Sequence, residues 1–165
     1  MNTNSRLTIG QVVGLGAALL VLLLFFFPWV EFNLLLASVN MSGYQLATGS
    51  GPVGSKFPGV PSLWLVPLSM LGVLALVGSC LLGQKSQLRS TVAFVLIAAG
   101  GISALVIVYQ YLNLNQQLNQ NPLGMFAQNI FSYSFGAHGA LVGSAGVVLG
   151  GVIDLMTSSK TVPAA

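Results

Sequence analysis

The ionisable side chains Glu31, His138 and Asp154 are the residues of this sequence whose types could support acid–base or ligand chemistry. Asp154 lies near the end of an apolar segment, where a carboxylate could carry a proton or bind an ion. The simpler interpretation is an acid that reaches water at the membrane surface. His138 precedes Asp154 by sixteen residues, so at about 100° per residue the two side chains point toward nearly opposite faces of one helix. We therefore expect no proton relay between them.

Few further groups are available for catalysis or metal binding. The sequence has one histidine and one cysteine, too few for an ordinary zinc site, and no recognisable Ser-His-Asp set or paired carboxylates. We expect no catalytic residue, no metal site and a protein that is not an enzyme, while any cofactor stays unknown. For His138 a structural hydrogen bond is the simpler role, and ligation of a pigment, haem or metal is the alternative. Glu31 could pair with Lys56 at the surface or meet a partner's cation.

The distribution of charge places the chain in a membrane. Residues 90–153 contain no Asp, Glu, Lys or Arg, and the whole sequence is 55% hydrophobic and 4% charged. Each charge held at the centre of a bilayer costs at least ~2.5 kcal/mol, which explains such long charge-free stretches. The five basic residues are scattered, so they form no patch for nucleic acid.

Four apolar segments are long enough to cross a bilayer as helices, because ~20 residues span its ~30 Å core. We predict an all-α integral membrane fold, a four-transmembrane-helix bundle, in one polytopic domain over residues 1–165. The first segment is longer than the ~7–15 apolar residues of a signal peptide, so we predict an uncleaved anchor. The predicted helices cover residues 8–27, 63–83, 91–112 and 135–156.

The basic residues indicate the orientation. Lys56 falls on one side of a four-span arrangement and the other four basic residues on the opposite side, which by the positive-inside rule is cytoplasmic. We expect a multi-pass protein of the bacterial inner (plasma) membrane with both termini in the cytoplasm. Residues 28–62 and 113–134 then form outer loops, and residues 84–90 an inner loop. The four cytoplasmic basic residues are Arg6, Lys85, Arg89 and Lys160.

The outer loops predict a small cap. Residues 30–46 are rich in Val, Phe, Leu and Tyr around turn-prone positions and predict a β-hairpin, followed by an irregular loop of Gly and Pro over residues 49–61. Trp29 lies at the start of the first outer loop, residues 28–62, and Trp64 lies just after its end. Both are candidate anchors at the headgroup level. The amide-rich second loop predicts that the third helix continues toward Pro122. Beyond it, apolar residues at helical spacing predict a short interfacial helix: Leu123, Phe126, Ile130 and Phe131.

Small residues form a seam along the fourth apolar segment. They repeat at alternating steps of three and four, which places them on one helix face. In lipid such residues let helix backbones approach closely. Two interpretations stay open, packing inside one bundle and contact with a neighbouring subunit. The seam consists of Gly136, Gly139, Gly143, Gly146 and Gly150.

Two resemblances follow from the first outer loop. Pro28-Trp29, followed by residues 42–49 (SGYQLATG), is similar to a loop of small uncharacterised bacterial four-span membrane proteins. The layout, with a β-structured loop after a tryptophan that follows the first helix, also resembles the claudin-like class. The Gly-Leu-Trp motif and paired loop cysteines of claudins are absent, so the resemblance implies a topology and no site residue.

Three functional hypotheses result. The first is a non-catalytic accessory or scaffold subunit of a larger membrane assembly, with membrane lipids and other membrane subunits, or a second copy, as partners. The second is a small oligomeric channel or transporter, with Asp154, His138 or amides along its path. The third is a subunit of a photosynthetic or respiratory complex that binds a pigment or quinone through His138, Trp64 or Tyr109.

Overall fold

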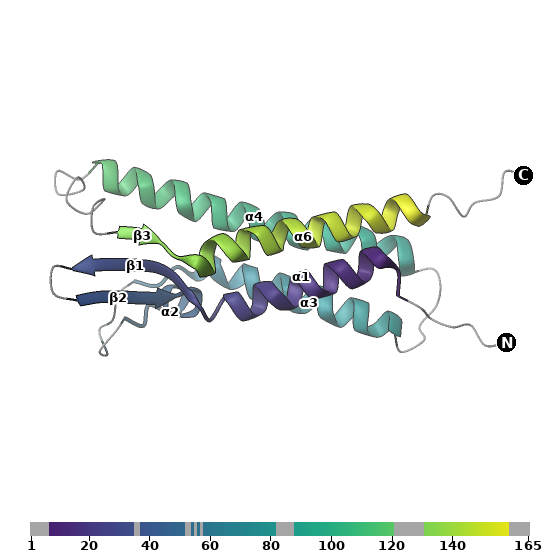
Figure 1. The fold of residues 1–165 in the computed structure, drawn as a ribbon, viewed down its shortest axis with the longest axis horizontal. Helices are drawn as coiled ribbons and strands as arrows, with labels where there is room; N and C mark the ends of the chain where they lie inside the picture. The colour runs from purple at the N-terminus through teal and green to yellow at the C-terminus, as the bar shows by residue number, and fades with distance from the viewer. Residues whose placement is uncertain are drawn as a thin grey trace, which may run out of the picture.

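The computed structural model describes residues 7–34, 37–51, 54, 56, 58–81, 88–120 and 131–158. Its long helices lie side by side in an elongated bundle, and its strands gather at one end, as Figure 1 shows. In chain order the elements are α1 (Ile9–Leu24), β1 (Pro28–Leu34), β2 (Ala37–Ser42), α2 (Gly43–Thr48), η2 (Pro61–Trp64), α3 (Leu65–Leu81), α4 (Leu88–Gln120), β3 (Phe131–Tyr133) and α6 (Phe135–Ser158).

Three helices are long and apolar enough to cross a membrane. These are the η2–α3 segment, α4 and α6, as the charge-free stretches predict. The first predicted span is shorter than expected, because α1 has 16 residues and a length of about 24 Å. Pro28 disfavours helical geometry at Phe27, so the chain leaves the helix in a turn over residues 25–27. A bundle of four complete spans is therefore not established by helix length.

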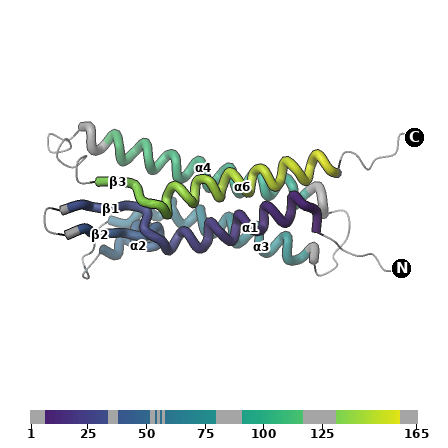
Figure 2. Tube along the Cα trace, in the orientation of Figure 1, coloured from purple at the N-terminus to yellow at the C-terminus, as the bar shows by residue number. Residues whose placement is uncertain are grey.

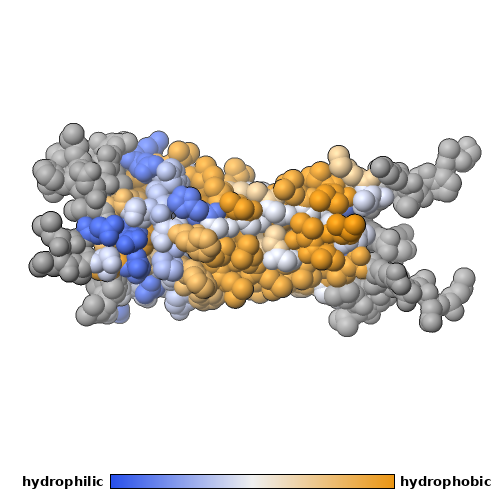
Figure 3. Space-filling view, viewed as in Figure 1, coloured by the Kyte–Doolittle hydropathy of each residue, from blue (hydrophilic) through white to orange (hydrophobic). Residues whose placement is uncertain are grey.

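The four helices share one apolar core. α6 packs against both α1 and α4, and α3 packs against α4 and α1. Large aliphatic side chains fill the space between them, among them Val21, Met70, Leu96 and Val147. On the face drawn in Figure 3, apolar side chains cover the bundle, whereas hydrophilic residues gather around the strands. This pattern is expected of a bundle surrounded by lipid with a cap in water.

The cap is built on a three-stranded antiparallel sheet of order β2-β1-β3. The predicted hairpin is confirmed, with Glu31 of β1 opposite Asn40 of β2. Its second strand ends earlier than expected, because Ser42 caps α2 by accepting a hydrogen bond from the Gln45 backbone N–H (3.2 Å). Gly49, with φ of 73°, ends that helix in the left-handed region.

The second outer loop differs from the prediction at its end. Residues 121–130, most of the predicted interfacial helix, lie outside the described residues. Phe131, its last member, belongs to a strand, where it pairs with Phe32 of β1. The predicted continuation of the third helix is confirmed: α4 has 33 residues, about 50 Å, and extends beyond the bundle alongside the sheet (Figure 1).

Candidate functional site

Asp154 is fully buried, which corrects the expectation that its carboxylate reaches water. The Thr8 hydroxyl donates a hydrogen bond of 2.5 Å to Oδ1, and the Gln11 side-chain amide donates one of 3.2 Å to Oδ2. Both donors belong to the start of α1, where Thr8 and Gln11 also form a capping box. The carboxylate thus faces the positive end of the α1 dipole, which favours an acceptor there.

This contact is possible because α1 and α6 approach closely. A Cβ atom added to Gly10 would lie 2.6 Å from the backbone nitrogen of Asp154. One added to Gly150 would lie 2.6 Å from the backbone nitrogen of Gly14. Only glycines allow such backbone proximity, so Asp154 is held against the first turn of α1. We interpret the Thr8–Gln11–Asp154 cluster as a connection between two helices, with each carboxylate oxygen paired.

The remaining seam glycines also face α1 and the chain that follows it. A Cβ at Gly139 would lie 2.7 Å from a methyl carbon of Leu24, and one at Gly143 would lie 2.6 Å from a methyl carbon of Val21. Gly146 is less tight, with its added Cβ 3.1 Å from that of Ala17. The structure therefore places this seam inside the chain, where α1 occupies it.

Trp29 is buried rather than exposed to headgroups, which corrects its predicted role as an interface anchor. Its side chain is 4% exposed, and its Nε1–H donates a hydrogen bond of 2.8 Å to the Leu24 carbonyl at the end of α1. The ring lies between two glycines: a Cβ at either Gly43 or Gly136 would approach it to 2.8 Å. Ser134 donates a backbone hydrogen bond of 2.9 Å to the Trp29 carbonyl. Trp29 therefore joins the cap to the bundle.

Trp64 keeps an exposed position. Its side chain is 39% exposed, and its ring meets that of Tyr44 edge-on at 5.9 Å. Tyr44 in turn stacks on Phe26, which is itself exposed. These aromatic side chains lie where the apolar bundle meets the cap, a position typical of an interfacial belt.

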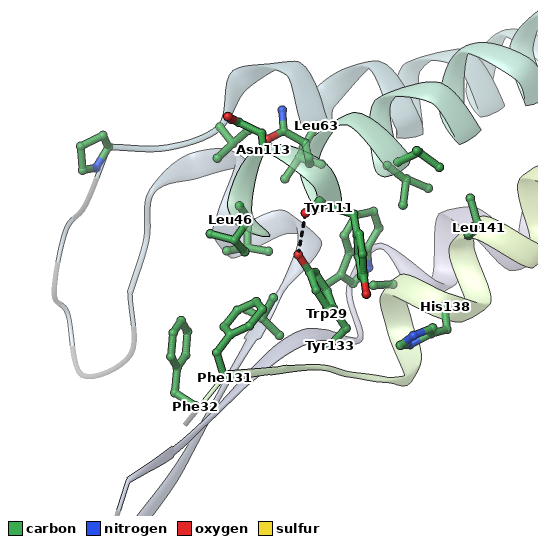
Figure 4. A pocket seen from close by; sticks show the side chains of 18 residues that line it. Trp29, Phe32, Leu46, Leu63, Tyr111, Asn113, Phe131, Tyr133, His138 and Leu141 are labelled. Atoms are coloured by element: carbon green, nitrogen blue, oxygen red, sulfur yellow. Dashed lines mark hydrogen bonds between the residues drawn. The ribbon is translucent and has the colours of Figure 1, made fainter. Parts of the chain in front are cut away.

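A cavity of about 730 Å³ lies between the sheet and the extension of α4 (Figure 4). Each neighbouring element supplies apolar side chains to it. Phe32 comes from β1, Phe131 from β3, Leu63 from η2, Val108 from α4 and Leu141 from α6. Pockets of this size and lining are typical of binding sites for apolar small molecules.

Tyr133 crosses this cavity from the sheet to α4. Its hydroxyl donates a hydrogen bond of 3.3 Å to the Tyr111 carbonyl, and the two rings stack with centroids 4.2 Å apart. Burial, and to a lesser degree the neighbouring Tyr111, raises the pKa of Tyr133 to about 12. The two tyrosines therefore connect β3 to α4 across the cavity.

The polar groups of the cavity are few and uncharged. Gln110 donates a side-chain hydrogen bond of 2.7 Å to the Ser62 hydroxyl, and Asn113 lies one turn further along α4. His138 lies at the N-terminal end of α6, where its Nδ1 is 3.1 Å from the Ser134 carbonyl. Because a carbonyl only accepts, Nδ1 carries a proton in this contact, which leaves Nε2 as the acceptor of the corresponding neutral tautomer.

The other predicted site residues are not brought together. Glu31 lies on the sheet opposite Ser132. The backbone of Lys56 forms an isolated antiparallel β-bridge with Ser50. The described residues contain no ion pair between Glu31 and Lys56. Tyr109 points outward from α4 and is 63% exposed. Of the three alternative pigment or quinone ligands, His138 lines the cavity, whereas Trp64 and Tyr109 do not. Within the described ranges no group of three acidic, histidine or cysteine residues is placed to hold a metal.

The cavity itself was missed by sequence reasoning. Its walls come from segments up to about a hundred residues apart in the chain, such as Phe32 and Phe131. The available signal was the alternation of Phe131 and Tyr133, which is typical of a strand with one covered face. Comparison of the chain with protein-family models, with curated proteins and with solved structures finds no match.

Proposed function

We propose that this protein is a non-catalytic accessory or scaffold subunit of a larger membrane assembly, and that it docks its partner through the outer cap. The observation that carries the proposal is the free edge of the sheet. β2 (Ala37–Ser42) is an outermost strand, and its far side pairs with no other strand in the part of the chain that the structure describes. An unpaired edge offers backbone donors and acceptors to a strand of a partner.

The cap is well suited to present that edge. The Trp29 hydrogen bonds and the Tyr133–Tyr111 contact hold the sheet on the bundle at two places. Ser38 and Asn40 of β2 are exposed, so a partner strand meets small polar side chains there. A rigid, water-exposed edge loses little conformational entropy when it binds.

We further propose that all four helices span the plasma membrane, with α1 completed by the apolar turn over residues 25–27. The first turn of α1 and the last turn of α6 lie at the same end of the bundle (Figure 2). This supports placing both termini on one side of the membrane. The basic residues of the sequence favour the cytoplasm for that side.

A channel or transporter is the less supported alternative. Between the described helices the core is filled by apolar side chains such as Val73, Leu96 and Val147. Ser69 and Ser103 hydrogen bond to each other (2.7 Å), and Ser144 bonds to the Ala140 carbonyl (2.8 Å). Asp154 is likewise paired, so these groups offer no polar path through a single bundle. An oligomeric pore would have to form between chains.

Extraction in mild detergent tests the proposal. We expect protein subunits at a fixed ratio to co-purify with the intact chain, as measured by size determination and mass spectrometry. Replacing Ser38 and Asn40 by lysine should release them, because charged lysines obstruct strand pairing at an edge. Gln116→Lys, also exposed but on the extension of α4, is the matched control and should retain the partner. A partner-free homo-oligomer would overturn the proposal and favour the channel.

A further inference from the structure

The cavity between the sheet and α4 has no role in docking a partner at β2, and its chemistry points to a small ligand. We propose that it binds a neutral membrane amphiphile, a molecule with a long apolar chain and an uncharged head that carries hydroxyl or carbonyl groups. This inference is independent of the proposed docking function, because the sheet residues that line the cavity belong to β1 and β3 and none belongs to β2.

The position of the cavity supports an occupant from the membrane. Two of its lining residues, Val108 and Leu141, lie within one turn of Leu105 and Val142 along their helices. Leu105 and Val142 are 71% and 70% exposed, so this level of the bundle faces lipid. Asn113, at the other end of the lining, belongs to the extension of α4 alongside the sheet. The cavity thus crosses from the lipid level into the cap, as an amphiphile would require.

Its size and lining support an apolar chain. A volume of about 730 Å³ lies within the ~300–1,000 Å³ typical of small-molecule sites. Aromatic side chains from both outer loops enclose it, including Phe32 and Phe131, whose rings meet edge-on at 5.4 Å. Leu63 and Ile107, both almost fully buried in the core, form its inner wall. Moving an apolar chain into such a site removes apolar surface from water at the cap.

The polar groups select an uncharged head. The described lining contains no Lys, Arg, Asp or Glu, so a charged head would lose its hydration without gaining an ionic partner. Asn113 offers an amide with donors and an acceptor, and Gln110 retains its side-chain carbonyl after bonding to Ser62. The His138 tautomer with its proton on Nδ1 offers an acceptor at Nε2. Hydroxyl and carbonyl groups satisfy this set of partners.

Trp29 provides a built-in reporter. The chain has two tryptophans, of which Trp29 lines the cavity and Trp64 does not. In a Trp64→Phe background, quenching by a brominated chain reports occupancy next to Trp29. The probes are the monoglyceride of dibromostearic acid and the free acid, which share one chain and differ in head charge. The intact chain is reconstituted in phosphatidylcholine nanodiscs for both titrations.

We expect saturable quenching by the monoglyceride, with an affinity at least about tenfold higher than that of the ionised acid. Filling the cavity with Val108→Phe and Leu141→Phe should weaken monoglyceride binding by about tenfold or more. The control pair, Leu105→Phe and Val142→Phe, adds the same bulk on the lipid-facing side and should leave it unchanged. If the filled variant unfolds, His138→Phe provides a second test. This variant should weaken binding of the monoglyceride and leave binding of the acid unchanged.

Quenching that rises linearly with probe content, equally for both probes, would show partition into the bilayer and overturn the inference. Equal saturable affinities would overturn the assignment of a neutral head. Neither outcome affects whether a protein partner co-purifies through β2, so failure of this inference and failure of the docking proposal are distinguishable.

Discussion

The carboxylate of Asp154, near the end of α6, accepts a 2.5 Å hydrogen bond from the hydroxyl of Thr8, the residue that caps the start of α1. The two residues are 146 positions apart, so this bond joins the first helix to the last at one end of the bundle. At the opposite end, Trp29 and Tyr133 attach the cap. Each of these contacts leads to a measurable consequence.

Replacing Asp154 should destabilise the bundle to a degree that depends on the replacement. Asp154→Leu leaves the Thr8 hydroxyl and the Gln11 amide without their acceptor, which costs about 1–3 kcal/mol for the buried Gln11 amide and less for the half-buried Thr8 hydroxyl. Asp154→Asn keeps one carbonyl acceptor and should cost less. Thermal unfolding in detergent measures both. Equal stability of the leucine variant and the wild type would contradict the buried cluster.

The α1–α6 contact should not tolerate a methyl group at Gly150. A Cβ there would lie 2.6 Å from the Gly14 backbone nitrogen, so Gly150→Ala should destabilise the protein by about 1–3 kcal/mol. Gly72→Ala is the control, because a Cβ there meets nothing within 4 Å. Since alanine favours the helix by up to ~1 kcal/mol over glycine, the control should be neutral or stabilising. Similar unfolding temperatures for the two variants would argue against the close approach.

The two tryptophans should differ in their effect on stability. Trp29→Phe removes the bond to the Leu24 carbonyl in a buried site and should cost about 1–3 kcal/mol. It should also raise hydrogen exchange in β1, which this bond holds near the bundle. Trp64→Phe, at an exposed position, should change stability by less than ~0.5 kcal/mol. The prediction fails if Trp64→Phe proves the more damaging change.

Tyr133 should make stability fall at alkaline pH. Burial raises the pKa of Tyr133 from 10.0, the ordinary value of tyrosine, to about 12 in the folded protein. The raised pKa means that the unfolded chain loses this proton first, so the contribution is fully present below pH 10 and is lost as pH rises through about 12. Unfolding measured across this window should show a smaller loss in Tyr133→Phe than in the wild type. An identical pH profile for both proteins would refute the assignment.

Much of the architecture followed from local sequence properties. Charge-free stretches predicted the three helices that are long and apolar enough to cross a membrane. Alternating β-favouring residues predicted the hairpin of β1 and β2, and amide-rich sequence before Pro122 predicted the extension of α4. These predictions succeed because helix and strand formation, and partition into lipid, depend on residues near one another in the chain.

Other features depended on which segments meet. The glycine spacing in the last helix predicted a seam, but only the structure identifies α1 as the element that occupies it. Trp29 and Asp154 were expected near the membrane surface, because sequence position alone places them at the ends of apolar segments. Trp29 is buried because Gly136, far along the chain, lets the backbones approach closely, and Asp154 is buried because Gly150, one turn before it in α6, lets α1 approach.

The sequence by itself determined apolar helices long enough to cross a membrane and a small β-containing cap, because lipid admits few charges and requires backbone hydrogen bonds within each helix. Tertiary structure alone decided the Thr8–Asp154 bond, the pairing of β3 with β1 and the cavity lined by Phe32, Phe131 and Leu141. Those features join segments far apart in the chain, and their geometry is set by how the whole bundle and cap pack together.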